Sequence, residues 1–264
     1  MTPLSRMREP ARLRGLLFDI DETLTTEGRL TAGAYSAMET LKRAGRLVVP
    51  ITGRPAGWCD HIARMWPVDA VVGENGAFYF RFTDGRLVKR FQDDEATRAM
   101  HRAQLKDIGE RILREIPGCA LASDQAYRES DLAIDFCEDV PPLPLETAER
   151  IAALMRAEGL TAKISSIHVN GWFGGYDKLA MAKRLFSEAF ALDADTLRRD
   201  FAFAGDSPND APMFAYFDHS VGVANVARFA GRMEAAPKFV TRNAAGAGFA
   251  EIVAHLVGQS AGER

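Results

Sequence analysis

A continuous apolar run that ends in two acidic residues constrains the fold more than any other stretch of this sequence. Residues 16–18 (Leu-Leu-Phe) lead directly into Asp19, and Asp21 follows after one intervening residue. A run this short and uniformly apolar is typical of a strand buried on both faces, as in a parallel sheet covered by helices. Ligands bind beyond the carboxyl ends of such strands. The two aspartates are therefore expected at the edge where a site would form, although alone they could equally be an acidic junction between a strand and a turn.

The same pattern of strand, polar loop and helix recurs along residues 1–81. An apolar run at 47–51 is followed by Thr52-Gly53-Arg54-Pro55 and a helix around 58–65, and a third run at 68–72 ends in Gly73-Glu74-Asn75-Gly76. The pattern resumes after residue 176, with strands expected at 201–204, 220–223 and 239–241. Such a succession predicts an α/β fold, a Rossmann-like doubly wound parallel sheet.

The middle of the chain has a different order of elements. Apolar runs at 78–82 and 87–91 flank Asp84-Gly85, which predicts a hairpin, and a long helix is expected with Met100, Ile108 and Ile112 on one stripe. Further strands and a second helix follow without the strand–loop–helix alternation. We therefore predict a discontinuous core of residues 1–81 and 176–264, interrupted by an inserted α+β cap domain at 82–175.

Composition and charge exclude several classes of protein. The chain has 264 residues, is 47% hydrophobic and 26% charged, and carries a net charge of -3. These values favour a soluble globular protein and give no support for nucleic acid as a partner. No apolar run approaches membrane-spanning length. The three cysteines, at wide spacings, indicate neither a disulfide framework nor a zinc site, so a cytoplasmic location is expected.

Three further polar segments complete a set of four that the predicted sheet would bring together. Thr52 and residues 205–210 (Gly-Asp-Ser-Pro-Asn-Asp) follow predicted strands, and Lys178 begins a predicted helix. Loops at the carboxyl ends of neighbouring parallel strands meet at one edge of the sheet. The resulting site would hold four aspartates, one hydroxyl and one ammonium group, from Asp19, Asp21, Asp206, Asp210, Thr52 and Lys178.

These residue types predict phosphoryl transfer assisted by a cation. So many carboxylates in one place need a positive partner, and oxygen ligands in this number suit Mg²⁺. A carboxylate can also act as a nucleophile and form an aspartyl-phosphate. An ammonium group, a hydroxyl and nearby backbone N–H groups can hold the transferring phosphoryl group.

In this order, the four motifs resemble those of the haloacid dehalogenase superfamily, and the insert resembles the large α+β cap of its Cof-type and sugar-phosphatase subclass. The resemblance covers nearly the whole chain. It implies a Mg²⁺-dependent phosphatase in which Asp19 is the nucleophile. It also implies that Asp21 protonates the leaving oxygen and then deprotonates the hydrolytic water. Glu22 departs from the pattern, because many members have Gly after the second aspartate.

The resemblance also assigns the binding residues. The phosphoryl group would be held by Thr52, Gly53 and Lys178. Mg²⁺ would be held by Asp19, the backbone carbonyl of Asp21, and Asp206. Asn209 and Asp210 would support the ion through water or from outside its ligand sphere.

Five other residues are candidates for substrate contact. Arg54 could be a phosphate neighbour or part of a structural ion pair, and Asn75 could contact substrate or only form a turn. The segment at 167–173 alternates as a strand, with His168, Asn170 and Trp172 on one face. That face could bind a sugar ring or could be a half-buried interface.

The expected activity is hydrolysis of a small phosphorylated metabolite, a sugar phosphate such as those of sucrose-phosphate and mannosyl-3-phosphoglycerate phosphatases. One alternative is a phosphomutase resembling phosphomannomutases, in which a second sugar hydroxyl accepts the phosphoryl group. Another is a non-catalytic sugar-phosphate-binding protein, which would have no need of an acid/base aspartate. The expected partner is a small phosphate ester, and the expected state is a monomer or homodimer.

Overall fold

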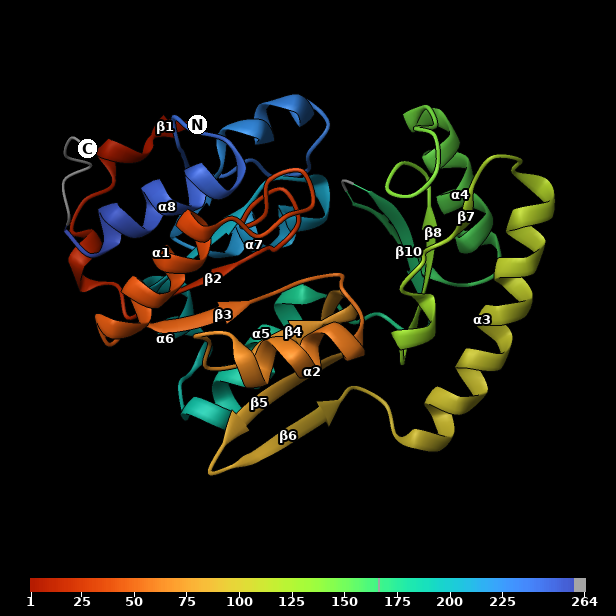
Figure 1. Cartoon of the computed structure of the whole chain (residues 1–264), viewed down its shortest axis with the longest axis horizontal. Helices are drawn as coiled ribbons and strands as arrows, with labels where there is room; N and C mark the ends of the chain where they lie inside the picture. The colour runs from red at the N-terminus through yellow and green to blue at the C-terminus, as the bar shows by residue number, and fades with distance from the viewer. Residues whose placement is uncertain (166, 259–264) are drawn as a thin grey trace.

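The computed structural model describes residues 1–165 and 167–258. Its central feature is a six-stranded sheet in which every neighbouring pair is parallel (Figure 1). The strands expected at 16–18, 47–51, 201–204, 220–223 and 239–241 are all present. Their order across the sheet is β1 (Thr2–Pro3), β13 (Phe239–Val240), β12 (His219–Gly222), β11 (Phe201–Gly205), β2 (Gly15–Phe18) and β3 (Leu47–Pro50).

Helices cover both faces of this sheet, and β2 shows why its sequence is apolar throughout. Leu16 and Phe18 pack with α1 (Ala32–Arg43) and α8 (Ala245–Leu256), and the Phe18 ring lies 4.8 Å from that of Phe249. Leu17 points the other way, into a cluster with α5 (Lys178–Phe190) and α7 (Ala211–Tyr216). Successive side chains of a strand alternate between faces, so burial on both faces requires an unbroken apolar run. The predicted doubly wound fold is confirmed.

A three-stranded antiparallel sheet continues the core beyond β3. It consists of β4 (Val71–Gly73), β5 (Phe78–Thr83) and β6 (Arg86–Phe91), and a parallel bridge between Ile51 and Val72 joins it to the main sheet. The hairpin turn places Asp84 and Gly85 at φ 50° and 70°, as the predicted turn requires. The expected start of the inserted domain, residue 82, lies inside β5. We therefore propose that the division falls after β6, where the chain leaves this sheet.

The inserted segment forms a second, antiparallel sheet. Its strand order is β7 (Ala120–Leu121), β8 (Asp131–Asp135), β10 (His168–Trp172) and β9 (Thr161–Ile164). One face packs on α3 (Glu95–Glu115) and α4 (Leu145–Ala157), which lie on the outer side in Figure 1. Met100, expected on the apolar stripe of α3, is 55% exposed; the buried stripe begins at Leu105. In the turns of α3 before Leu105 the packing contacts come from Arg98, which lies 3.7 Å from the centroid of the Phe91 ring, and from His101, which stacks on Phe173 at 4.7 Å. Met100 is left on the exposed side of the helix.

The remaining helices are short or lie at the edges of the core. They are α2 (Ala56–Met65), α6 (Ala194–Asp200), η1 (Leu4–Arg6), η2 (Pro10–Arg12), η3 (Glu74–Gly76), η4 (Gln125–Tyr127), η5 (Pro208–Asp210) and η6 (Ala224–Phe229). Within residues 1–165 and 167–258, none of the helices is both long and apolar enough to cross a membrane.

Candidate active site

The centre of the candidate site is a buried lysine bound to two carboxylates. Lys178 Nζ donates to Asp19 Oδ1 at 2.7 Å and to Asp210 Oδ1 at 2.8 Å. Asp19 follows β2, and Asp210 belongs to η5, just beyond the end of β11. Lys178 is the first residue of α5, where Asp177 caps the helix by accepting from the Ala180 N–H at 2.7 Å. These three side chains, far apart in the sequence, therefore meet at the carboxyl edge of the parallel sheet.

A third carboxylate completes an acidic cluster. Oxygens of Asp19, Asp206 and Asp210 lie within 4.8 Å of one another, and all three residues are buried. Burial, opposed by the charge of Lys178 and reinforced by the charges of Asp210 and Asp21, raises the pKa of Asp19 to about 7. Burial, followed by the charges of Asp19 and Asp210, also raises the pKa of Asp206 well above its usual value. One ammonium group does not neutralise this cluster, so a hard divalent cation fits the donor set.

The structure places the remaining predicted metal residues around this cluster. Asp210 is more than a distant support, because its carboxylate is one of the three clustered groups. Its Oδ2 accepts from the Asp206 and Ser207 N–H groups at 3.1 and 3.4 Å, which holds the loop in shape. Asn209 lines the adjoining cavity, and its Oδ1 accepts from Ser207 Oγ at 2.6 Å.

Thr52 and Gly53 lie at the end of β3, beside the acidic cluster's loops. Thr52 is fully buried, and its hydroxyl accepts from the Arg54 N–H at 3.0 Å. A Cβ at Gly53 would lie 3.2 Å from the Asn75 amide nitrogen. Asn75 Nδ2 is itself buried, with no hydrogen-bond partner within the described part of the chain. Asn75 therefore packs on the proposed phosphate loop, and its contact with substrate stays a prediction.

Arg54 forms an ion pair with Asp21, one of the two roles left open by the sequence. It also lines the cavity beside Asp19, so its role as a phosphate neighbour stays a prediction. Arg54 is 4% exposed, and its Nη2 and Nε donate to Asp21 Oδ1 at 2.8 and 3.0 Å. The same guanidinium donates to Glu138 Oε1 at 2.6 Å and to Asp124 Oδ2 at 3.4 Å. Both of these acids belong to the inserted segment, so Arg54 links that segment to the catalytic edge of the sheet.

A narrow cavity lies between the catalytic loops and the inserted sheet. Its walls combine polar groups from both parts of the chain. They are Asp19, Asp21, Gly53, Arg54, Ser207 and Asn209 from the core, and Ser165, Ile167, His168 and Asn170 from the inserted segment.

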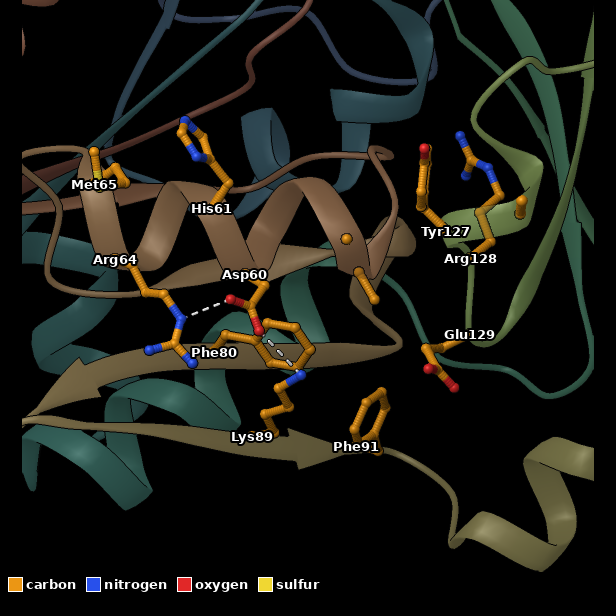
Figure 2. A pocket seen from close by; sticks show the side chains of 13 residues that line it. Asp60, His61, Arg64, Met65, Phe80, Lys89, Phe91, Tyr127, Arg128 and Glu129 are labelled. Carbon is orange, nitrogen blue, oxygen red and sulfur yellow. Dashed lines mark hydrogen bonds and ion pairs between the residues drawn. The ribbon is translucent and has the colours of Figure 1, made fainter.

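A larger hollow lies between α2, the β5–β6 hairpin and residues 126–129 (Figure 2). Three of its charged groups are paired with one another, because Asp60 binds Arg64 at 2.7 Å and Lys89 at 3.2 Å. None of the predicted site residues lines it. We therefore assign the chemistry to the smaller cavity.

Comparison with known proteins agrees with this assignment. The family model of haloacid dehalogenase-like hydrolases matches residues 16–129, a range that includes Asp19, Asp21 and Thr52. A phosphoglycolate phosphatase of Haloarcula marismortui is 29% identical over 240 residues, covering 90% of this chain and 95% of that protein. Over residues 16–129 the chain is similar to the haloacid dehalogenase-like hydrolases. The predicted resemblance is confirmed, and the expected class of enzyme, a phosphatase, agrees with the name of this relative.

Solved structures show the same fold over almost the entire chain. A Thermoplasma acidophilum protein superposes with a TM-score of 0.69 at 19% identity, covering 92% of this chain and 98% of that one. The sucrose-phosphatase of Synechocystis, solved with sucrose and phosphate, superposes with a TM-score of 0.63 at 15% identity, covering 93% and 98%.

The structure accommodates Glu22 at the position where many members of the resembled superfamily have Gly. Glu22 adopts φ 55°, a conformation that favours Gly. Its backbone is held from two sides, because its N–H donates to Thr25 Oγ1 at 3.1 Å and its carbonyl accepts from Asn225 Nδ2 at 2.9 Å. These contacts offset the strain of a side chain at positive φ.

Asn225 is a site residue that the sequence did not indicate. Its Nδ2 also donates to Asp206 Oδ2 at 3.0 Å, and its Oδ1 accepts from the Ala245 N–H at 2.9 Å. It therefore orients one carboxylate of the cluster. Asn225 lies in η6, outside the four recognisable motifs, and a single Asn after a strand gave no signal for this role.

The structure corrects the prediction that Trp172 is a substrate residue. His168 and Asn170 line the cavity, but Trp172 is 1% exposed and stacks on Tyr176 with ring centroids 5.6 Å apart. Its Nε1 donates to the Tyr176 carbonyl at 3.2 Å. The face assignment along β10 was correct. However, the strand runs away from the cavity, so Trp172 reaches the apolar cluster beneath α2 instead.

Proposed function

We propose that this chain is a Mg²⁺-dependent phosphomonoesterase that acts through a phosphorylated Asp19 on a small metabolite. The observation that supports this most strongly is the buried group of Asp19, Lys178, Asp206 and Asp210, with Asp21 facing the same cavity. Asp21 is 17% exposed at its side chain, so it can reach both a leaving group and water. A pure binding site would need the charges but not this second carboxylate.

In the first step, an Asp19 oxygen attacks phosphorus while the bond from phosphorus to the ester oxygen breaks. Asp21 gives its proton to that leaving oxygen. Lys178 balances the charge of Asp19, and Thr52 with Gly53 offers a hydroxyl and backbone groups to the phosphoryl oxygens. In the second step, Asp21 takes a proton from a water that attacks phosphorus, and inorganic phosphate leaves with the Asp19 carboxylate restored.

The metal would be held by Asp19, Asp206 and the Asp21 carbonyl, with Asp210 and Asn209 adjacent. When bound, Mg²⁺ would supply positive charge against which the phosphate dianion and these carboxylates can come together.

The leaving group is proposed to be a small polar molecule, a sugar or a compound of similar size. The lining of the cavity offers hydrogen-bonding groups of Ser165, His168 and Asn170 with one apolar side chain, Ile167. The names of two similar proteins support a leaving group of this size, since one is a phosphoglycolate phosphatase and the other a sucrose-phosphatase. We favour a sugar phosphate.

The test is release of inorganic phosphate from a panel of phosphorylated sugars, short hydroxy acids and nucleotides, with Mg²⁺ and with a chelator. We expect release from at least one small ester, loss of release in chelator and recovery when Mg²⁺ is restored. Conversion to an isomer without phosphate release would indicate a phosphomutase instead. Binding without turnover would indicate a sensor, and full activity after exhaustive metal removal would contradict the metal site.

A further inference from the structure

Arg54 connects the acid/base aspartate to the inserted segment. Its guanidinium binds Asp21 at 2.8, 3.0 and 3.1 Å and Glu138 at 2.6 and 3.4 Å. It also lies over the Trp58 ring, 4.4 Å from the centroid. Within residues 1–165 and 167–258, no other side chain hydrogen-bonds to the Asp21 carboxylate. The position of Asp21 therefore depends on where Arg54 is held.

Arg54 is held in turn by a carboxylate that the inserted segment fixes in place. The guanidinium is a planar, rigid fork, so binding one acid along one edge sets the direction of the other edges. Glu138 follows β8 in a turn that Asp135 closes by accepting from the N–H groups of Cys137, Glu138 and Asp139 at 2.9, 2.8 and 2.8 Å. His168 Nε2 lies 2.8 Å from Glu138 Oε2 on the other side. Glu138 thus has a defined position that belongs to the inserted sheet.

We propose that Glu138 is a positioning residue for Asp21, acting through Arg54 when the inserted segment lies on the core. The acid/base carboxylate is then in its catalytic orientation only when the inserted segment encloses the substrate. This inference rests on the proposed phosphatase function. The competing explanation is that the Arg54–Glu138 pair only attaches the inserted segment to the core.

The first test compares Glu138→Gln and wild type on an alkyl phosphate and on an activated aryl phosphate such as p-nitrophenyl phosphate. A poor alkoxide leaving group needs the proton from Asp21, whereas nitrophenolate leaves without it. We expect kcat/KM for the alkyl ester to fall at least about tenfold, a part of the 10²–10⁴ that a general acid supplies. The aryl ester should change by less than about threefold.

Two further variants separate positioning from attachment. Asp21→Asn with Glu138→Gln should be no slower on the alkyl ester than Asp21→Asn alone, because Glu138 acts through Asp21. Glu129→Gln is the matched control: Glu129 is also an inserted-segment acid paired with an arginine, Arg102 at 2.9 Å, but it does not contact Arg54. We expect it to leave both substrates unchanged. Equal losses on both esters for Glu138→Gln, or additive losses in the double variant, would overturn the proposal.

A structural measurement tests the inference independently of activity. Crystal structures of wild type and Glu138→Ala should show the Asp21 carboxylate displaced from Arg54 or spread over several rotamers in the variant. An Asp21 that keeps its wild-type position would contradict the inference. Failure of wild type to release phosphate from any ester would instead count against the proposed function, and this structural comparison would still decide the role of Glu138.

Discussion

Asn170 and Trp172 lie on the same face of β10 but have different surroundings. We therefore expect replacement of Trp172 to affect stability and replacement of Asn170 to affect activity. Asn170 lines the cavity and donates to Asp131 Oδ2 at 2.9 Å, whereas Trp172 is enclosed in an apolar cluster. Trp172→Ala should lower the free energy of unfolding by about 3–5 kcal/mol, because it removes a large buried ring. Asn170→Ala should lower kcat/KM for the best natural ester while changing that for p-nitrophenyl phosphate much less.

The two variants are checked by denaturant unfolding and by steady-state kinetics on both esters. If Trp172→Ala leaves the stability unchanged, or lowers kcat/KM for the natural ester alone, Trp172 contacts the substrate after all. Equal kinetic losses for Asn170→Ala on both esters would show that Asn170 does not contact the leaving group.

At the scale of elements, the short helix η3 attaches the inserted segment to the core through the side chain of Glu74. This fully buried carboxylate accepts from the N–H groups of Glu129 at 2.9 Å, Ser130 at 2.6 Å and Asp131 at 3.2 Å, and from that of Ala56 in the core at 2.9 Å. Gly76 packs against the Asp177 carbonyl, where a Cβ would lie 2.1 Å away, and so sets the start of α5. One turn therefore positions both the inserted segment and Lys178.

Glu74 should make stability depend on pH. Burial, followed by the charge of Asp131, raises the pKa of Glu74 from 4.5 to about 8. Between these values the native state binds a proton that the unfolded chain has released, so the contribution to the free energy of unfolding falls as pH rises. Glu74→Gln, which does not titrate, should flatten that slope between about pH 5 and 8.

The measurement is urea unfolding at several pH values for wild type, Glu74→Gln and the control Glu129→Gln. The control should keep the wild-type slope, because the Glu129 side chain is 39% exposed. An identical slope in wild type and Glu74→Gln would show that Glu74 does not hold the extra proton.

At the scale of the whole molecule, the sequence was sufficient to predict the parallel core and to predict that its motifs lie together at one edge of the sheet. Strand patterning gave β2, β3 and β11, and the rule that sites form at carboxyl ends brought together Asp19, Thr52 and Asp206. The same patterning recognised the hairpin and the elements of the insert, because these depend on local periodicity and turn residues.

Contacts between the core and the insert were not predictable in the same way. Arg54 and Glu138 are 84 residues apart, and nothing in the local sequence around either residue predicts their contact. The two alternatives for Arg54 stayed open for this reason. The position of Trp172 was missed because alternation identifies a face but not how far along the strand the cavity extends.

The most direct test of the account is the identity of the phosphorylated residue during turnover. Asp21→Asn enzyme would be mixed with p-nitrophenyl phosphate and Mg²⁺, quenched in acid, digested and analysed by mass spectrometry. Since this variant should break down the intermediate slowly, we expect one phosphoryl group on the peptide that contains Asp19, and none in Asp19→Asn enzyme, whose turnover should fall by several orders of magnitude. Phosphate release with no phosphoryl group on that peptide, or with one on a different residue, would contradict the account.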